Sequence, residues 1–300
     1  MTKHKKASKG ISAKYSNKET SRNSNKPSAH PSPNYLGKEN LSSSRPRPSG
    51  SGLGPNGQIW LYGNHVVEAA LANPKRRKYR LLVNQDWSTD YEVDGNEVQP
   101  EYVPRQDIES QLPADAVYQG LALLVAPLEY EAIETICSES EEDSVVIVLD
   151  RITDPRNIGA IMRSAAAFGA SAVIVPNKHT PEVTAVLAKA ASGGLDRLPM
   201  VRVTNLTRAL GLLKDAGFWT VGLDANSDQT LAQANLSGKL AVILGAEGTG
   251  LRRLTSENCD YLVKIPIDPT ADSLNVSAAA AITLYEIARN RAGSNNTNTK

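Results

Sequence analysis

The chain of 300 residues has little cysteine, few aromatic residues and no long apolar run. Its two cysteines, Cys137 and Cys259, lie far apart in the sequence, which argues against a disulfide framework and against a zinc site. No apolar run approaches the length of a membrane span, and no signal peptide is visible. We therefore expect a soluble protein of a reducing compartment, the cytoplasm, with no membrane partner.

Acidic residues are scarce at the N-terminus. Residues 1–50 contain eleven Lys and Arg but only two acids, a net charge of +9, whereas the whole chain carries +1 and the other 250 residues therefore −8. Residues 1–55 also hold few large aliphatic side chains, so we predict a disordered basic arm. Such an arm is either an attractant for RNA phosphates or an inert tail. An organellar presequence is a third option, disfavoured by the missing apolar helix face.

The remaining sequence divides into two regions with regular elements. Residues 56–126 predict a small α/β domain, with strands near 59–63, 79–84 and 120–125 and helices near 65–71 and 106–111. Residues 127–143 are acidic and polar, which predicts a linker or an exposed helix.

From residue 144 onward, apolar runs alternate with helical patterns. Strands are predicted at 145–149, 172–175, 218–223, 240–244 and 261–265, and helices at 157–168, 183–190, 206–216, 251–258 and 275–291. This alternation predicts an α/β domain over 144–292, with a mainly parallel sheet covered on both faces, and a disordered tail at 293–300. In the last helix, Val276, Ala280, Leu284 and Ile287 share one face, which should pack on the sheet or on a partner.

Three stretches place small or polar residues directly after apolar runs, where open α/β sheets bind ligands. The first runs from Asp154 to Arg163, with Asp154 as a helix N-cap and Pro155 in the first turn. Asn157 then lies near the helix start, and Arg163 lies about two turns further along. Taken alone, Asn157 is better read as an amide that satisfies a loop, and Arg163 as a surface charge.

The second stretch, Gly245-Ala-Glu-Gly-Thr-Gly250, has three interpretations. A phosphate cradle is disfavoured because the glycine order differs from that of dinucleotide-binding turns and because Glu247 would repel a pyrophosphate, which argues against a nicotinamide oxidoreductase. A tight turn that needs positive φ angles remains open. So does an adenosine pocket of backbone groups, with Glu247 orienting a nearby polar residue.

The third stretch, Ile265-Pro266-Ile267, leads after a short loop into Ser273-Leu274-Asn275 and an alanine-rich helix. Ser273 or Asn275 should cap that helix. The run Ala278–Ala281 should let another backbone approach closely.

In this order and spacing, the three stretches resemble the SpoU-type RNA methyltransferases, a branch of the SPOUT superfamily. The resemblance covers residues 144–291, and residues 59–126 more loosely. It implies S-adenosylmethionine bound in a deep C-terminal trefoil knot, a homodimer and no metal, none of which periodicity could suggest. It also implies a catalytic set, which consists of Asn157, Arg163, Glu247, Ser273 and Asn275. The implied backbone contacts to the cofactor are at Gly245, Ile265 and Leu274.

The small domain resembles a ribosomal-protein-like module that recognises RNA in a subset of this family. Tyr62-Gly63-Asn64-His65 matches its opening and Gln119-Gly120 its closing strand. Tyr118 stands where that subset often has histidine, which leaves the target nucleotide open.

Together these resemblances imply methylation of a ribose 2′-hydroxyl, in a guanosine of large-subunit (23S-type) ribosomal RNA. The alternatives are a tRNA 2′-O-methyltransferase and a catalytically inactive RNA-binding ribosome assembly factor. Because a guanidinium stays protonated, we expect Arg163 to stabilise the developing alkoxide rather than to act as a base. Glu247, Ser273 and Asn275 are expected to orient Arg163.

Overall fold

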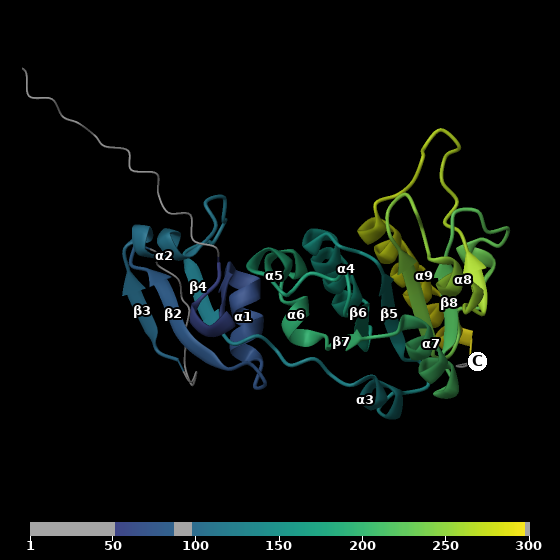
Figure 1. Cartoon of the computed structure of the whole chain (residues 1–300), viewed down its shortest axis with the longest axis horizontal. Coiled ribbons are helices and arrows are strands. Elements are labelled where there is room, and N and C mark those ends of the chain that lie inside the picture. The colour runs from purple at the N-terminus through teal and green to yellow at the C-terminus, as the bar shows by residue number, and fades with distance from the viewer. Residues whose placement is uncertain (1–51, 87–97, 298–300) are drawn as a thin grey trace, which may run out of the picture. The chain divides into compact units, whose positions relative to one another are not determined.

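The computed structural model describes residues 52–86 and 98–297 (Figure 1), which belong to one compact unit. The predicted basic arm therefore lies outside the described residues except for its last four. Those four are ordered, because Leu53 forms a β-bridge with Ile59 and a short 3-10 helix begins at Pro55.

The first sheet has four strands in the order β1-β4-β2-β3. Its elements are β1 (Ile59–Tyr62), α1 (Asn64–Ala72), β2 (Lys78–Asn84), β3 (Pro100–Val103), α2 (Arg105–Gln111) and β4 (Leu121–Val125). Strand β4 is antiparallel to both β1 and β2, whereas β3 is parallel to β2. Every predicted element of this region is present, and β3 is an addition. We call residues 59–125 the small module.

Between the two sheets lies α3 (Ile133–Ser138), within the predicted linker. Ile133 and Ile136 are buried and join a core cluster with residues of α7 and β7. A helix is therefore present in this segment, as one of the two predictions had it, but two of its apolar side chains are buried rather than exposed. Two apolar residues at i and i+3 were the signal, hidden among acidic neighbours.

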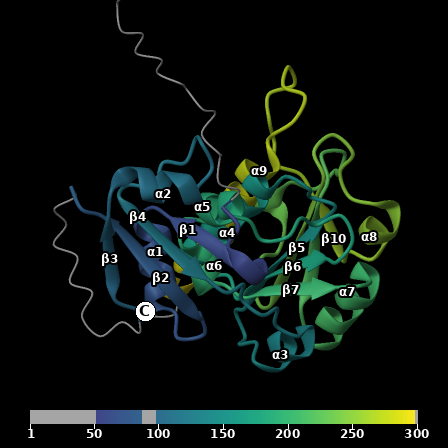
Figure 2. The same ribbon diagram turned by 60° about the vertical axis from the view of Figure 1, so that its left-hand side comes forward.

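The second sheet has six strands, all parallel, in the order β10-β8-β9-β5-β6-β7 (Figure 2). The strands are β5 (Val145–Asp150), β6 (Ala172–Pro176), β7 (Met200–Val203), β8 (Trp219–Leu223), β9 (Leu240–Gly245) and β10 (Tyr261–Val263). The helices are α4 (Pro155–Ala167), α5 (Ala185–Ala191), α6 (Gly194–Arg197), α7 (Leu206–Asp215), α8 (Arg253–Glu257) and α9 (Val276–Thr297). The predicted parallel α/β sheet is confirmed.

Alternate residues of each strand feed two apolar clusters on opposite faces. In β5, Ile147 belongs to the cluster with α4, α5 and α9, and Val146 to the cluster with α3 and α7. The sheet is therefore covered on both faces, as predicted. The four residues that share one face of α9 are all buried, and this helix packs on α4 and β9. It continues to Thr297, so residues 293–297 are helical where a disordered tail was predicted.

Close packing between α4 and α5 depends on Gly159. A Cβ atom there would lie 2.5 Å from the carbonyl oxygen of Leu187 and 2.6 Å from the Cβ of Ala190. Because overpacking a tight helix contact costs about 1–3 kcal/mol, Gly159→Ala should lower the free energy of unfolding by that amount. Gly211 is the matched control, since a Cβ at this position in α7 meets nothing within 4 Å.

The measurement is urea denaturation of both variants beside the wild type. Gly211→Ala should be stabilising by about 0.5–1 kcal/mol, because alanine favours helix over glycine. Equal stability of the two variants would contradict the packing argument.

Candidate functional site

The three stretches singled out in the sequence meet at the carboxyl ends of the central strands. Strands β5 and β9 are neighbours, with Asp150 in register with Gly245. At the start of α4, the Asp154 side chain accepts a hydrogen bond of 2.8 Å from the Arg156 amide, and proline occupies the first turn. The predicted cap is confirmed, and it places Asn157 in the first helical turn beside the end of β9.

A single carboxylate oxygen gathers donors from two distant segments. Oε1 of Glu247 accepts hydrogen bonds from Nδ2 of Asn157 at 3.0 Å and from Nδ2 of Asn275 at 2.7 Å. It also accepts the backbone amide of Val276 at 3.3 Å, and Nδ2 of Asn275 donates to Oδ1 of Asn157 at 3.0 Å. We call Asn157, Glu247 and Asn275 the amide–carboxylate cluster. It ties the first, second and third stretches into one site.

Asn275 has a second function as the cap of α9. Its Oδ1 accepts the backbone amides of Ser277 at 2.9 Å and of Ala278 at 3.4 Å. This confirms that one of the two polar residues of the third stretch is the cap. Ser273 is exposed, and in the described part of the chain no hydrogen bond joins it to the cluster.

The glycine-rich stretch is a tight turn that folds back on its own strand. Gly248 and Gly250 have φ angles of 77° and 64°, and the Gly250 amide donates to the Ala246 carbonyl at 2.8 Å. A Cβ atom at Gly245 would lie 2.2 Å from the carbonyl carbon of Gly250. The tight-turn interpretation is confirmed, and Glu247 at its apex orients polar neighbours, as the third interpretation anticipated.

The end of this turn is held by a buried acid that the sequence analysis missed. Asp150, 0% exposed, accepts Nε of Arg252 at 2.7 Å and the backbone amide of Arg252 at 3.1 Å. No local pattern in the sequence marks this acid, because its partner, Arg252, lies far along the chain.

Arg163 lies outside the amide–carboxylate cluster. Six residues after Asn157, it is turned about 240° around the helix, and its side chain is exposed. Among residues 52–86 and 98–297, the guanidinium makes no hydrogen bond or ion pair. The expectation that Glu247, Ser273 and Asn275 orient Arg163 is therefore wrong within one chain.

The residues expected at the cofactor also lie at this edge of the sheet. Ile265 follows β10 and Leu274 precedes the α9 cap, and both are half-buried. Their backbone amides are donors that no acceptor within the described residues uses. Backbone donors of this kind can receive a ligand without a charged side chain.

The sulfur of Cys259 lies next to Gly222, near the end of β8. Burial raises the pKa of its thiol to about 12, and its Sγ donates to the Thr255 carbonyl at 3.3 Å. A thiol that stays protonated at neutral pH is a poor nucleophile, so Cys259 is a packing residue. Across the described ranges, no group of three His, Cys, Asp or Glu is placed to hold a metal ion, and no helix is long and apolar enough to span a membrane.

Comparison with known proteins identifies the family to which this chain belongs. The model of the SpoU rRNA Methylase family matches residues 144–285. An uncharacterized tRNA/rRNA methyltransferase of Mycolicibacterium vanbaalenii is 45% identical over 63% of this chain, which spans only 61% of that relative's length. The 23S rRNA (guanosine-2′-O-)-methyltransferase RlmB of Pseudomonas putida is 36% identical over 77% of this chain and 96% of its own length.

Solved structures agree on the fold. The SpoU methyltransferase AviRb of Streptomyces viridochromogenes is 25% identical, with a TM-score of 0.69 over 79% of this chain and 91% of AviRb. A complex of AviRb with the cofactor AdoMet (S-adenosylmethionine) gives a TM-score of 0.67 at 24% identity, over 78% of this chain and 91% of AviRb.

Proposed function

Because this chain belongs to the SpoU rRNA methylase family, we propose that it transfers a methyl group from S-adenosylmethionine to a ribose 2′-hydroxyl of ribosomal RNA. The observation that carries the proposal is the amide–carboxylate cluster, which assembles residues of all three stretches at the carboxyl edge of the sheet. The RlmB relative is matched over nearly its whole length, which favours a guanosine of 23S-type RNA in the large subunit as the target. Such a target implies action in the cytoplasm.

The residues at the edge of the sheet fit the cofactor. When bound, S-adenosylmethionine supplies the methyl group on a positively charged sulfur. The backbone of Gly245, Ile265 and Leu274 would hold it, and the hydrogen bond between Glu247 and Asn275 fixes the loop that carries Leu274 against the glycine turn. This contact explains why a carboxylate stands in a turn that need not bind phosphate.

Arg163 would serve the RNA rather than the cofactor. A 2′-hydroxyl gains negative charge as it attacks, and a fixed guanidinium stabilises that charge without giving up its own proton. Arg163 is exposed and has no acidic partner within the described residues, so its charge is available to a ribose or phosphate oxygen. Asn157, on the same helix, is anchored through Glu247 and would keep that helix in place.

We also propose that the end of the chain forms the trefoil knot of this family. Strand β10 lies at the edge of the sheet, yet α9 returns to pack on α4 and on the central strand β9. The hydrogen bonds of Asn275 to the first two stretches support a chain that threads back between them.

The face formed by α4 and α9 supports a homodimer. Phe168, Ile282 and Tyr285 are exposed by 38%, 40% and 57%, and the rings of Phe168 and Tyr285 meet edge to face at 6.3 Å. Three large apolar side chains on one face are what a second copy would cover. Sedimentation should therefore give twice the chain mass of 32.2 kDa, and Ile282→Arg should shift the protein to the monomer. A monomeric wild type would contradict this assignment.

The small module, within residues 56–126, is proposed to recognise the RNA, followed by a methyltransferase domain at 144–292. Residues 1–51 of the basic arm lie outside the described residues, and attraction of RNA phosphates stays a prediction for them.

The test of this function uses the purified full chain. Calorimetry should show binding of S-adenosylhomocysteine, and single-turnover assays with large-subunit RNA should yield 2′-O-methylguanosine. Transfer to tRNA instead would favour the tRNA enzyme. Cofactor-product binding without transfer to either RNA would favour an inactive assembly factor, and binding of NADH in its place would overturn the class.

A further inference from the structure

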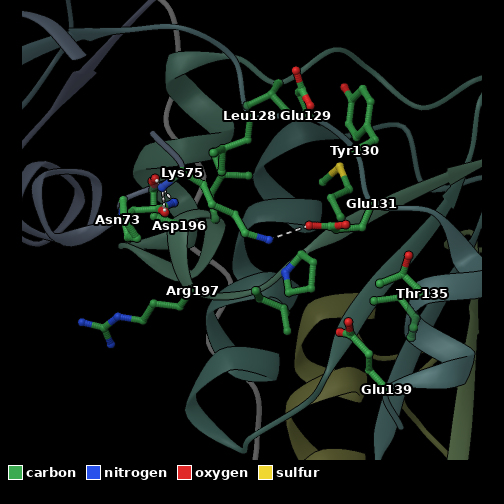
Figure 3. A pocket seen from close by; sticks show the side chains of 17 residues that line it. Asn73, Lys75, Leu128, Glu129, Tyr130, Glu131, Thr135, Glu139, Asp196 and Arg197 are labelled. Carbon is green, nitrogen blue, oxygen red and sulfur yellow. Dashed lines mark hydrogen bonds and ion pairs between the residues drawn. The ribbon is translucent and has the colours of Figure 1, made fainter. Parts of the chain in front are cut away.

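A buried ion pair joins the small module to α6. Arg76 and Asp196 have side chains 1% and 0% exposed, with Nε to Oδ1 at 2.7 Å and Nη2 to Oδ2 at 3.0 Å. Nδ2 of Asn73 donates to the same Oδ1 at 3.1 Å, and Arg76 also donates to the Ala126 carbonyl at 2.9 Å. Asn73 and Asp196 both line a cavity of about 440 Å³. Figure 3 shows the two side chains next to each other. A bidentate pair of planar groups fixes direction as well as distance.

Gly193 and Gly194, shortly before Asp196, lie close to the backbones of two different helices, α1 and α4. Gly193 has a φ angle of 88°, and a Cβ atom there would lie 2.9 Å from the carbonyl oxygen of His65 in α1. A Cβ at Gly194 would lie 2.9 Å from the carbonyl oxygen of Met162 and 3.2 Å from the amide nitrogen of Arg163 in α4. Two consecutive glycines thus bring the small module and the peptide of Arg163 to either side of one turn.

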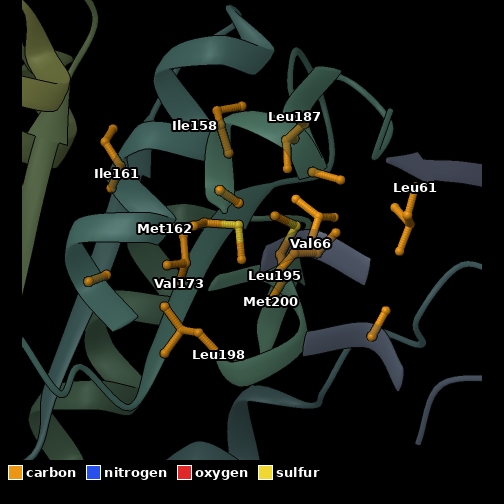
Figure 4. Close-up of a cluster of buried hydrophobic side chains, with 14 of the residues drawn as sticks. Leu61, Val66, Ile158, Ile161, Met162, Val173, Leu187, Leu195, Leu198 and Met200 are labelled. Atoms are coloured by element: carbon orange, nitrogen blue, oxygen red, sulfur yellow. The ribbon is translucent and has the colours of Figure 1, made fainter. Parts of the chain in front are cut away.

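Apolar packing makes this link continuous. Val66 of α1, Leu195 of α6 and Met162 of α4 are all buried in one cluster, and Figure 4 shows them in one group. Protein interiors are close-packed, so a displacement of α1 is transmitted to α6 and to α4 rather than absorbed.

We propose that α6 is a positioning element, in which Asp196 sets the small module against the helix that carries Arg163. RNA held by the module would thereby be presented to Arg163 at a fixed distance. Asp196 touches neither RNA nor cofactor in this account, so it is a positioning residue. The proposal rests on the methyltransferase function proposed above.

The test compares Asp196→Asn with Glu131→Gln in the full chain. Glu131 forms an ion pair of 2.8 Å with Lys75, the residue before Arg76. The Glu131 and Lys75 side chains are 32% and 76% exposed, and ion pairs this exposed contribute little to stability. Single-turnover methyl transfer to large-subunit RNA is measured at saturating cofactor, with the concentration of active sites taken from the calorimetric stoichiometry of S-adenosylhomocysteine.

Misplacement of reacting groups by about 1 Å can cost 10²-fold, so Asp196→Asn should slow transfer per active site by roughly tenfold or more. Its affinity for S-adenosylhomocysteine should stay at the wild-type value, and Glu131→Gln should match the wild type throughout. A purely structural role would reduce the stoichiometry and leave the rate per site unchanged. A wild-type rate per site in Asp196→Asn overturns the proposal.

A second variant covers the case in which Asp196→Asn does not fold. Arg76→Met combined with Asp196→Leu removes both charges together, an exchange that buried ion pairs often tolerate. It should fold, bind S-adenosylhomocysteine normally and still transfer methyl groups slowly, because apolar contacts lack the directed pair of hydrogen bonds between Arg76 and Asp196. Wild-type transfer by this variant would equally reject the positioning role. A wild type that neither binds the cofactor product nor transfers methyl groups would instead reject the methyltransferase function itself.

Discussion

Arg163→Ala is expected to slow methyl transfer by roughly 10²–10³-fold, the scale seen when a donor that stabilises transition-state charge is removed. The effect should fall on the rate constant, because charge builds on the 2′-oxygen only as the methyl group transfers. Affinity for S-adenosylhomocysteine should stay at the wild-type value, since Arg163 is turned away from the amide–carboxylate cluster. Single-turnover transfer beside calorimetry makes the measurement.

Two further variants sharpen that result. Arg163→Lys should also be slow, because an ammonium cannot reproduce a planar guanidinium with several directed donors. Arg208→Ala is the matched control, since Arg208 is an exposed arginine of α7, on the opposite face of the sheet. Near-normal transfer by a folded Arg163→Ala protein would remove this residue from the mechanism.

Leu274→Arg is expected to abolish cofactor binding. Leu274 is half-buried and directly precedes Asn275. The side-chain amide of Asn275 donates a hydrogen bond of 2.7 Å to Glu247. An unpaired positive charge placed in this half-buried position costs several kcal/mol and would repel a positively charged ligand, so affinity should fall by roughly 10²-fold or more. Calorimetry with S-adenosylmethionine makes the measurement.

Leu254→Arg, at an exposed leucine of α8, is the control and should bind normally. A Leu274→Arg protein that binds the cofactor with wild-type affinity would move the pocket away from the third stretch.

The parallel sheet and its helices could be predicted because their apolar periodicity is long and regular. The elements that were missed are short or lack that signal. Strand β7 has four residues, α6 has four with a glycine first, and β3 begins with a proline and has no buried residue. In each of these the tertiary contact, rather than the local pattern, decides the structure.

The site was predictable in its members and less so in its contacts. The three stretches named Asn157, Glu247 and Asn275, and the structure brings these together. The misplaced contact was that of Arg163, although a spacing of six residues already turns two helical side chains to different faces.

Asp150 and Asp196 could not have been singled out. Burial of an acid is paid for by a partner distant in sequence, Arg252 for one and Arg76 for the other. Such a pairing is set by the folded arrangement and leaves no local trace in the chain.

The most direct test of the account is a map of 2′-O-methyl groups in total RNA from cells with and without the gene. We expect one guanosine of large-subunit ribosomal RNA to lose its 2′-O-methyl group in cells without the gene. The wild-type chain should restore it, and Arg163→Ala should not. An unchanged ribosomal RNA map, or a loss confined to tRNA, would contradict the central claim.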